Sequence, residues 1–256
     1  MKNYTARDGA TLTLDDAGER TTVDLYSQEG LDLLSNLWIK SAAEHRVMYE
    51  PTWLGRPIIQ FPTDIVAIQE LLWTVRPDVV IETGVAHGGS LILSASILEL
   101  IGTGKVLGVD IEIRPHNREA IEAHPLASRI RLIESSSTAD ETMEAVRKAA
   151  SGAKTVLVFL DSNHTEAHVL RELELYAPLV TPGSYLVAHD GAQAWVWDIP
   201  RGKPEWKDDH PLGAIHAFLE GHSEFSIEPN WTRFGITSSP DGWLKKAAAT
   251  EKGGEN

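Results

Sequence analysis

Acidic and imidazole side chains follow two short apolar runs in the second half of the chain. Asp161 and His164 come just after one run, and His189 and Asp190 come directly after the other. Both runs are typical of buried strands, and the carboxyl ends of neighbouring parallel strands open into the same crevice of a sheet. Carboxylate oxygens with an imidazole nitrogen suit Mg²⁺ or Mn²⁺, with waters completing the shell. We therefore expect a divalent metal on Asp161, His189 and Asp190; alternatively, the aspartates only cap the segments that follow.

A glycine-rich turn follows an earlier apolar run and leads into a helical pattern. It extends from Glu82 through Gly84 and Gly88 to Ser90. Glycines between a strand and a helix let the backbone approach a ligand closely, which is typical of nucleotide sites. The turn contains neither the G-x-G-x-x-G fingerprint nor the Gly-Lys-Ser/Thr of a P-loop. A tight strand-to-helix turn without a ligand is the alternative.

Polar residues at the ends of the next two predicted strands complete the pattern of an adenosyl-binding crevice. Asp110 ends the second strand, where an acid is placed to accept hydrogen bonds from a ribose diol. Ser135 and Ser136 follow the third strand, where they would meet an adenine edge. Taken singly, Asp110 is equally a helix cap and the serines are equally turn residues.

The elements that position these residues alternate regularly between residues 79 and 188. Strands are expected at 79–81, 106–109, 130–133, 155–160 and 185–188. Helices are expected at 90–101, 117–124, 139–150 and 165–176. Each parallel return needs a crossover, so the order predicts an α/β fold with a doubly wound, mainly parallel, Rossmann-like sheet.

The flanking segments add an extension and an irregular loop to this core. Residues 1–77 form an expected N-terminal extension with helices at 28–44 and 63–75, on the oligomer or acceptor side. Residues 78–256 form the ligand-binding domain, which includes a Trp-rich loop at 191–210. After it we expect a helix at 212–220 and extended segments at 225–227 and 233–237.

Tryptophans and leucines outside the core suggest binding surfaces. Flat aromatic faces suit sugar rings, so Trp195 and Trp197 are expected to line an acceptor pocket. Trp73 is expected in the core, and Trp38 and Trp53 at a subunit interface. The apolar cluster around residues 31–39 is larger than one short helix needs, which predicts a homo-oligomer.

The composition excludes several kinds of chemistry and partner. The 256 residues contain no cysteine, which excludes thiolate metal sites, disulfides and a cysteine nucleophile. A formal charge of −14 repels a phosphate backbone, so we expect no nucleic-acid partner. Residues 1–30 lack the apolar core of a secretory signal, and no apolar run approaches the roughly 18 residues of a membrane span. A cytoplasmic protein with a small-molecule partner and no membrane partner is therefore expected.

Several stretches together resemble a known family. They are Ile58–Trp73, Ile81–Gly84, Leu160–His164, Leu173–Gly183 and Tyr185–Asp190. The chain resembles, over about residues 53–243, the CmcI-type family, whose members are often labelled cephalosporin hydroxylase or rhamnosyl O-methyltransferase. The resemblance implies a class I methyltransferase fold that uses S-adenosylmethionine with a divalent metal. Repeated βα units argue against the hydroxylase label, since an iron oxygenase needs a facial triad on a different architecture.

The resemblance also implies roles for individual residues. Glu82, Gly84 and Gly88 would hold the methionine part of the cofactor, Asp110 the ribose, Ser136 the adenine, and Asp161 and Asp190 the metal. The chain departs from the family pattern at His189, where relatives carry an acid.

These observations predict an S-adenosylmethionine-dependent O-methyltransferase that acts on a small-molecule hydroxyl, on a sugar of a glycosylated natural product or of a glycolipid. Asp161 would support the metal, and His164 or His189 would take the proton from the acceptor. Two alternatives remain. One is a nucleotide-cofactor oxidoreductase, which the missing G-x-G-x-x-G disfavours, and the other is a non-catalytic adenosyl-ligand-binding protein.

Overall fold

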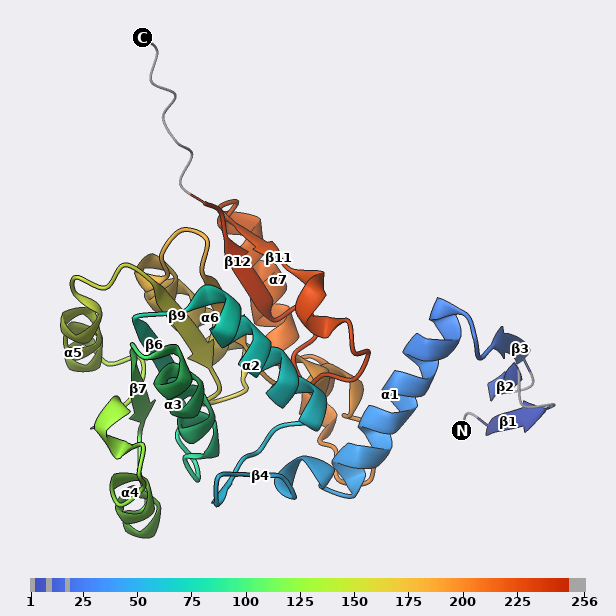
Figure 1. Cartoon of the computed structure of the whole chain (residues 1–256). Coiled ribbons are helices and arrows are strands. Elements are labelled where there is room, and N and C mark those ends of the chain that lie inside the picture. The colour runs from blue at the N-terminus through green and yellow to red at the C-terminus, as the bar shows by residue number, and fades with distance from the viewer. Residues whose placement is uncertain (1–2, 8–10, 17–18, 249–256) are drawn as a thin grey trace.

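A seven-stranded sheet forms the centre of the molecule (Figure 1). The computed structural model describes residues 3–7, 11–16 and 19–248. The strands lie in the order β11-β12-β10-β9-β6-β7-β8. Their bounds are β6 Val79–Thr83, β7 Lys105–Asp110, β8 Ile130–Glu134, β9 Val156–Leu160, β10 Tyr185–Ala188, β11 Phe225–Ile227 and β12 Trp243–Lys246. The strands from β10 to β8 pair in parallel, which confirms the predicted Rossmann-like α/β fold.

Helices cover both faces of this sheet, because the side chains of each strand alternate between two apolar clusters. One cluster contains Val80 and Phe159 with residues of α2, α3 and α4, and the other contains Ile81 and Leu160 with residues of α5, α6 and α7. The helices are α2 Pro62–Val75, α3 Gly89–Ile101, α4 Pro115–Glu122, α5 Asp140–Ala150, α6 Glu166–Tyr176 and α7 Pro211–Gly221. This doubly wound arrangement leaves the carboxyl edge of the sheet open for a site.

The segment before the sheet begins with a small antiparallel sheet of β1 (Asn3–Arg7), β2 (Thr11–Asp16) and β3 (Glu19–Asp24). Helix α1 (Gln28–Glu44) joins it to the body of the molecule (Figure 1). The Ser27 hydroxyl caps α1 by accepting a hydrogen bond from the Gly30 amide at 3.0 Å. A 3₁₀ turn, η1 (Val47–Tyr49), and a short hairpin of β4 (Thr52–Trp53) and β5 (Arg56–Pro57) then lead into α2.

The strands and helices predicted between residues 79 and 188 are all present, with bounds that shift by a few residues. The helices predicted at 28–44, 63–75 and 212–220 and the strand at 225–227 are also confirmed. The extended segment predicted at 233–237 is wrong, because turn and loop occupy those residues. The prediction missed β12, which pairs antiparallel with both β10 and β11.

Tryptophans are distributed differently from the expectation. Trp73, expected in the core, is 45% exposed, and the Arg76 guanidinium lies 4.9 Å from its ring centroid. The core instead contains Trp231 and Trp243. The predicted interface residue Trp53 is partly buried and donates from its indole to the Ser96 hydroxyl at 3.0 Å.

In the described part of the chain, no helix combines the length and the apolar character that a bilayer crossing requires. The cytoplasmic location stays a prediction.

Helix α1 leaves large apolar side chains in solvent. Leu31, Leu34 and Trp38 are 45%, 43% and 38% exposed, whereas Ile39 on the same helix is buried. Clustered exposed apolar residues of this size favour association. We predict a homo-oligomer, so sedimentation at micromolar concentration should give a mass above the 28.1 kDa of one chain. Leu31→Glu with Leu34→Glu should shift the protein toward monomer, and a wild-type protein that sediments only as a monomer would contradict the prediction.

Candidate active site

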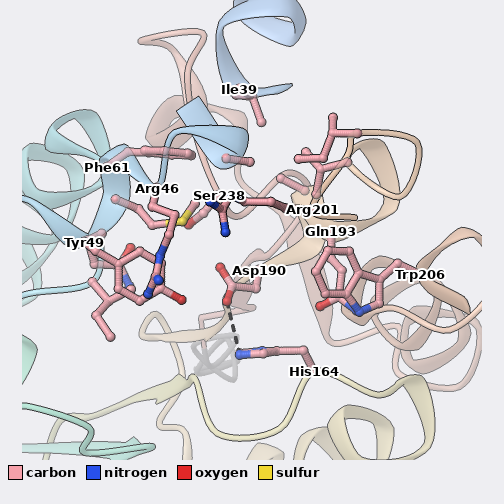
Figure 2. Close-up of a pocket in the computed structure, with 17 residues that line it drawn as sticks. Ile39, Arg46, Tyr49, Phe61, His164, Asp190, Gln193, Arg201, Trp206 and Ser238 are labelled. Atoms are coloured by element: carbon pink, nitrogen blue, oxygen red, sulfur yellow. Dashed lines mark ion pairs between the residues drawn. The ribbon is translucent and has the colours of Figure 1, made fainter. Parts of the chain in front are cut away.

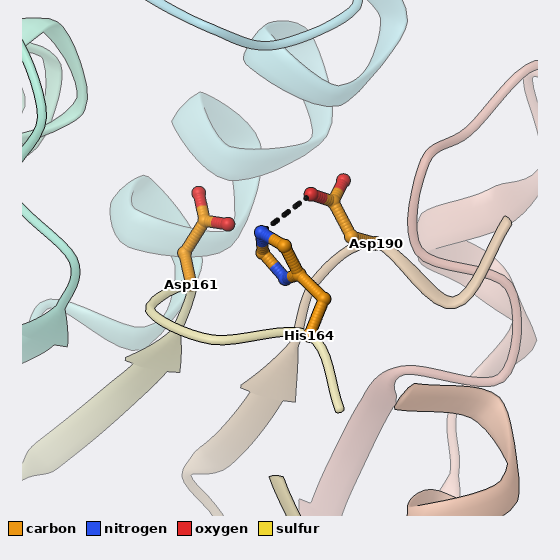
Figure 3. Close-up of side chains that lie close together, drawn as sticks. All are labelled: Asp161, His164 and Asp190. Carbon is orange, nitrogen blue, oxygen red and sulfur yellow. Dashed lines mark ion pairs between the residues drawn. The ribbon is translucent and has the colours of Figure 1, made fainter. Parts of the chain in front are cut away.

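Three side chains converge where two adjacent strands end. Asp161 follows β9 and Asp190 follows β10, which pair in parallel. His164 lies in the loop after β9, and its Nε2 is 3.2 Å from Asp190 Oδ2. One ligand atom from each of the three residues lies within 4.8 Å of the others (Figure 3). The structure therefore brings Asp161 and Asp190 together as predicted, with His164 in the place that the prediction gave to His189.

The electrostatics of this cluster favour a bound cation. Burial, followed by the charges of Asp190, Glu82 and Glu172, raises the pKa of Asp161 well above its usual value. The carboxamide of Gln60 donates to Asp161 Oδ2 at 3.2 Å, which only partly offsets this repulsion. Two carboxylates with an adjacent imidazole are a donor set that Mg²⁺ or Mn²⁺ accepts, with waters filling the remaining positions. The residues present thus fit a divalent metal.

His189 lies apart from this cluster. Its ring is 3% exposed, stacks on Phe159 with 5.7 Å between ring centroids, and bonds through Nδ1 to the Ser239 hydroxyl at 2.8 Å. Burial lowers the pKa of His189 to about 4, so the imidazole is neutral at pH 7. The geometry gives His189 a packing role instead of the predicted metal or proton-transfer role, and His164 occupies the place beside the two aspartates.

Two cavities meet at the cluster. The larger, of about 330 Å³, lies among α1, η1 and the loop after β10 (Figure 2). The smaller, of about 200 Å³, lies along the glycine-rich turn after β6. Both are lined by Tyr49, Ile59, Gln60, His164 and Asp190. A molecule in one cavity would therefore contact a molecule in the other beside the candidate metal site.

The smaller cavity depends on a glycine and an aspartate. Gly84 has φ +89°, and a Cβ there would lie 1.9 Å from the Asp161 carbonyl oxygen, so only glycine lets the turn pass the end of β9. Asp110 Oδ2 accepts hydrogen bonds from the amides of Val85 at 2.7 Å and Ala86 at 3.3 Å. Asp110 therefore fixes the turn; it is absent from the lining of both main cavities, and its contact with a ribose stays a prediction.

Three further residues predicted to bind the cofactor, Glu82, Gly88 and Ser90, differ in their access to the smaller cavity. Glu82 is 2% exposed and accepts a hydrogen bond from the Ser90 hydroxyl, and burial raises the pKa of Glu82 to about 7. Ser90 lines the smaller cavity, whereas Glu82 lines a small space behind it. Gly88 is absent from the lining of both main cavities; its φ of +81° starts α3, and a Cβ there would lie 2.4 Å from Ile121.

The predicted adenine residues lie beyond both main cavities. Ser135 donates its amide to the Asp110 carbonyl at 2.8 Å, and the Ser136 hydroxyl lies 3.2 Å from that of Thr138. Their contact with adenine stays a prediction.

The aromatic lining of the larger cavity differs from the expectation. Trp206, Tyr49 and Phe61 line it, whereas the predicted Trp195 and Trp197 do not. Trp195 packs beside the apolar cluster under α1, and Trp197 is 37% exposed. The Trp-rich loop thus supplies one tryptophan to the cavity, but a different one from those predicted.

The buried carboxylate of Asp64 anchors the loop that carries Ser238 to the lining of the larger cavity. Asp64 accepts from the Thr237 hydroxyl at 2.6 Å and from the Ser238 amide at 2.8 Å. Burial raises the pKa of Asp64 to about 6. The anchored loop places Ser238 on the cavity and Ser239 against His189.

Comparison with known proteins assigns the chain to a family. Residues 45–247 match the sequence profile of the rhamnosyl O-methyltransferase/CmcI family. The chain belongs to this family. It is 36% identical over 198 residues to a rhamnosyl O-methyltransferase of Mycobacterium leprae (strain TN), covering 75% of this chain and 82% of that one. A rhamnosyl O-methyltransferase of Mycobacterium bovis (strain BCG / Pasteur 1173P2) is 31% identical over 205 residues, with 77% and 79% covered.

Solved structures agree on the fold. A CmcI structure described with Mg and SAM superposes with a TM-score of 0.57 at 20% identity and covers 78% of each chain. An O-methyltransferase from Bacillus cereus in complex with SAH gives 0.50 at 16% identity and covers 79% of this chain and 84% of that one. The predicted family is confirmed, and with it the prediction of an O-methyltransferase.

Arg56 and Asn117, which the sequence did not single out, also hold the glycine-rich turn after β6. Arg56 Nη2 donates to the His87 carbonyl at 2.6 Å and to Asn117 Oδ1 at 3.0 Å. Asn117 Nδ2 in turn donates to the Ala86 carbonyl at 2.9 Å. Residues 56 and 117 lie far apart in the sequence, and nothing local in the sequence identifies this clamp.

We predict that Arg56→Met raises the KM for S-adenosylmethionine roughly tenfold with a smaller change in kcat, because each lost bond to a charged group is worth about 1.5–3 kcal/mol. Arg147→Met, on an exposed position of α5, is the control and should leave KM unchanged. Steady-state kinetics with thermal melts checks both variants. An unchanged KM in folded Arg56→Met protein would show that the clamp does not position the turn.

Asp110 is predicted to accept hydrogen bonds from the cofactor ribose. Asp110→Ala should weaken S-adenosylhomocysteine binding by at least roughly tenfold, because charge-assisted hydrogen bonds are worth about 1.5–3 kcal/mol each. Isothermal titration measures the affinity. Wild-type affinity in this variant would remove Asp110 from the cofactor site.

Proposed function

We propose that the protein transfers the methyl group of S-adenosylmethionine to a hydroxyl of a sugar-containing small molecule, assisted by a divalent metal. The proposal depends on one observation: His164 and Asp190 line both cavities, and Asp161 of the smaller cavity lies beside them. The smaller cavity, along the glycine-rich turn, suits the cofactor, and the larger suits the acceptor. The reacting groups would then meet beside the metal site.

The family relatives support this reading. Those reported above are named rhamnosyl O-methyltransferases, so a sugar hydroxyl is the acceptor class that they suggest. The CmcI structure described with Mg and SAM supports the same cofactors. In the larger cavity, the ring faces of Tyr49 and Trp206 suit a sugar or its aglycone.

The transfer requires little covalent participation from the protein. An oxygen–carbon bond forms to the acceptor as the carbon–sulfur bond of the sulfonium breaks, and the hydroxyl proton leaves. Holding the two substrates in line accounts for most of the rate enhancement. When bound, a divalent cation supplies Lewis-acid chemistry, which lowers the pKa of a coordinated hydroxyl.

The chain's own residues divide the remaining tasks. Asp161 and Asp190 would hold the metal, because both carboxylates line the smaller cavity within one cluster and Asp190 also faces the larger cavity. His164 would take the proton, since it lines both cavities and Asp190 orients its Nε2 at 3.2 Å. Gln60 would orient Asp161 through its bond to Oδ2.

The N-terminal extension would form the acceptor side of the site. Ile39 and Ala43 of α1 line the larger cavity, as do Met48 and Tyr49 of η1. This supports an acceptor-side role for α1 and η1 within the predicted 1–77 extension, whereas α2 of that extension packs against the central sheet.

Removing the metal should abolish turnover but largely spare cofactor binding. Excess chelator should stop transfer of a labelled methyl group to a rhamnoside, and Mg²⁺ or Mn²⁺ should restore it. Asp190→Asn should behave like chelation, whereas Asp140→Asn on α5 should not. His164→Ala should keep its metal affinity and slow turnover by about 10²–10⁴-fold if His164 is the base.

The outcomes separate the roles. Loss of metal affinity in His164→Ala would make His164 a ligand instead of the base. Full activity in excess chelator would remove the metal from the mechanism.

A further inference from the structure

The larger cavity contains two arginines in a strongly acidic protein. Arg46 and Arg201 both line it, although the chain carries a formal charge of −14. Both side chains extend into the cavity above Asp190 and His164 (Figure 2). A metal and a cofactor at the proposed sites would not account for these arginines, because neither lines the smaller cavity.

The two arginines differ in their ion pairs: Arg201 faces a carboxylate, and Arg46 does not. Arg201 faces Glu44: its Nε is 3.7 Å from Oε1, and its amide donates to Oε2 at 3.0 Å. Within the described ranges, Arg46 forms no ion pair; its guanidinium carbon lies 4.4 Å from the centroid of the Tyr49 ring. Stacking on a ring leaves the N–H edge of a guanidinium free for an oxyanion.

The backbone at Arg46 is also unusual. The residue follows α1 with φ 57° and ψ 34°, a left-handed conformation in which glycine is the favoured residue after a helix. Strained backbone of this kind is concentrated at binding sites. Arg76 has the same conformation outside both cavities, so what marks out Arg46 is its position in the cavity lining and not its backbone.

The lining of the larger cavity offers Arg46 no acidic partner that is free of another role. The ionisable side chains in its lining are Arg46, Arg201, His164, Asp190 and Tyr49, with Trp206 and aliphatic residues supplying much of the rest. In the proposed function Asp190 is committed to the metal. No acidic side chain in this lining therefore remains to pair with Arg46.

We propose that the acceptor carries an oxyanion, a carboxylate or a phosphate, which Arg46 binds while the acceptor's hydroxyl lies beside Asp190 and His164. Planar guanidinium groups bind such oxyanions in a bidentate manner. The inference rests on the proposed function and narrows it: the acceptor is an anionic glycoside.

The test measures binding to the full-length protein loaded with Mg²⁺ and S-adenosylhomocysteine. The probes are 4-carboxyphenyl, 4-phosphonooxyphenyl and neutral 4-carbamoylphenyl rhamnosides, the last being nearly isosteric with the first. By isothermal titration, at least one anionic probe should bind roughly tenfold or more tightly than the neutral probe. The two anionic probes distinguish a carboxylate from a phosphate.

Variants assign the preference to one side chain. Arg46→Gln should reduce it to about twofold or less, as expected when a charge-assisted bond is lost. Arg76→Gln is a matched control, because Arg76 also has a left-handed backbone after a helix and stacks on an aromatic ring, but lies outside both cavity linings. This control should keep the full preference.

Equal binding of anionic and neutral probes to the wild type, or a preference that survives Arg46→Gln, would overturn the inference. Labelled-methyl transfer to the neutral rhamnoside is a separate measurement. Transfer without any anion preference would leave the proposed function intact and remove only the anionic acceptor. An Arg46-dependent preference without transfer to any probe would support the anion site and count against sugar methylation.

Discussion

The repulsion between two carboxylates at the ends of adjacent strands dominates this molecule. Asp161 and Asp190 are brought together by the parallel pairing of β9 and β10, and buried Glu82 and Glu172 add to the negative potential. Such a cluster is stable when a cation or a proton is shared among its members. Two neighbouring residues position Asp161. Gly84 lets the glycine-rich turn pass close to the Asp161 backbone, and Gln60 orients the Asp161 carboxylate.

The central fold was predictable because its signal is local. Between residues 79 and 188, each strand is a short apolar run and each helix has its own periodicity. Strand β12 has no such signal, since only its pairing between β10 and β11 makes Trp243–Lys246 a strand. The prediction also missed the antiparallel pair β2 and β3, although the sequence carries a signal for it. Thr and Leu alternate over residues 11–14, and an Ala-Gly pair separates the two strands.

The site was predictable where topology alone determines it. Asp161, His164 and Asp190 were found because the carboxyl ends of parallel strands share an edge. His189 was misplaced because the chain turns just after β10, where Asp190 has a left-handed backbone (φ 60°, ψ 22°) that the sequence does not signal. When Asp190 faces the cavity, His189 is left between Phe159 and Trp243. The Arg56–Asn117 clamp has no signal in the sequence, because only the folded chain brings these residues together.

Helix α1 forms part of the wall of the larger cavity, although it lies outside the region that matches the family. The family match begins at residue 45, after α1 has ended, yet Ile39 and Ala43 of that helix line the larger cavity. The strand ends that carry Asp161 and Asp190 lie well inside the matched region. Part of the cavity wall therefore lies outside the matched region, whereas Asp161, His164 and Asp190 lie inside it. A substitution at Ile39 or Ala43 would change the shape of the cavity without touching Asp161, His164 or Asp190.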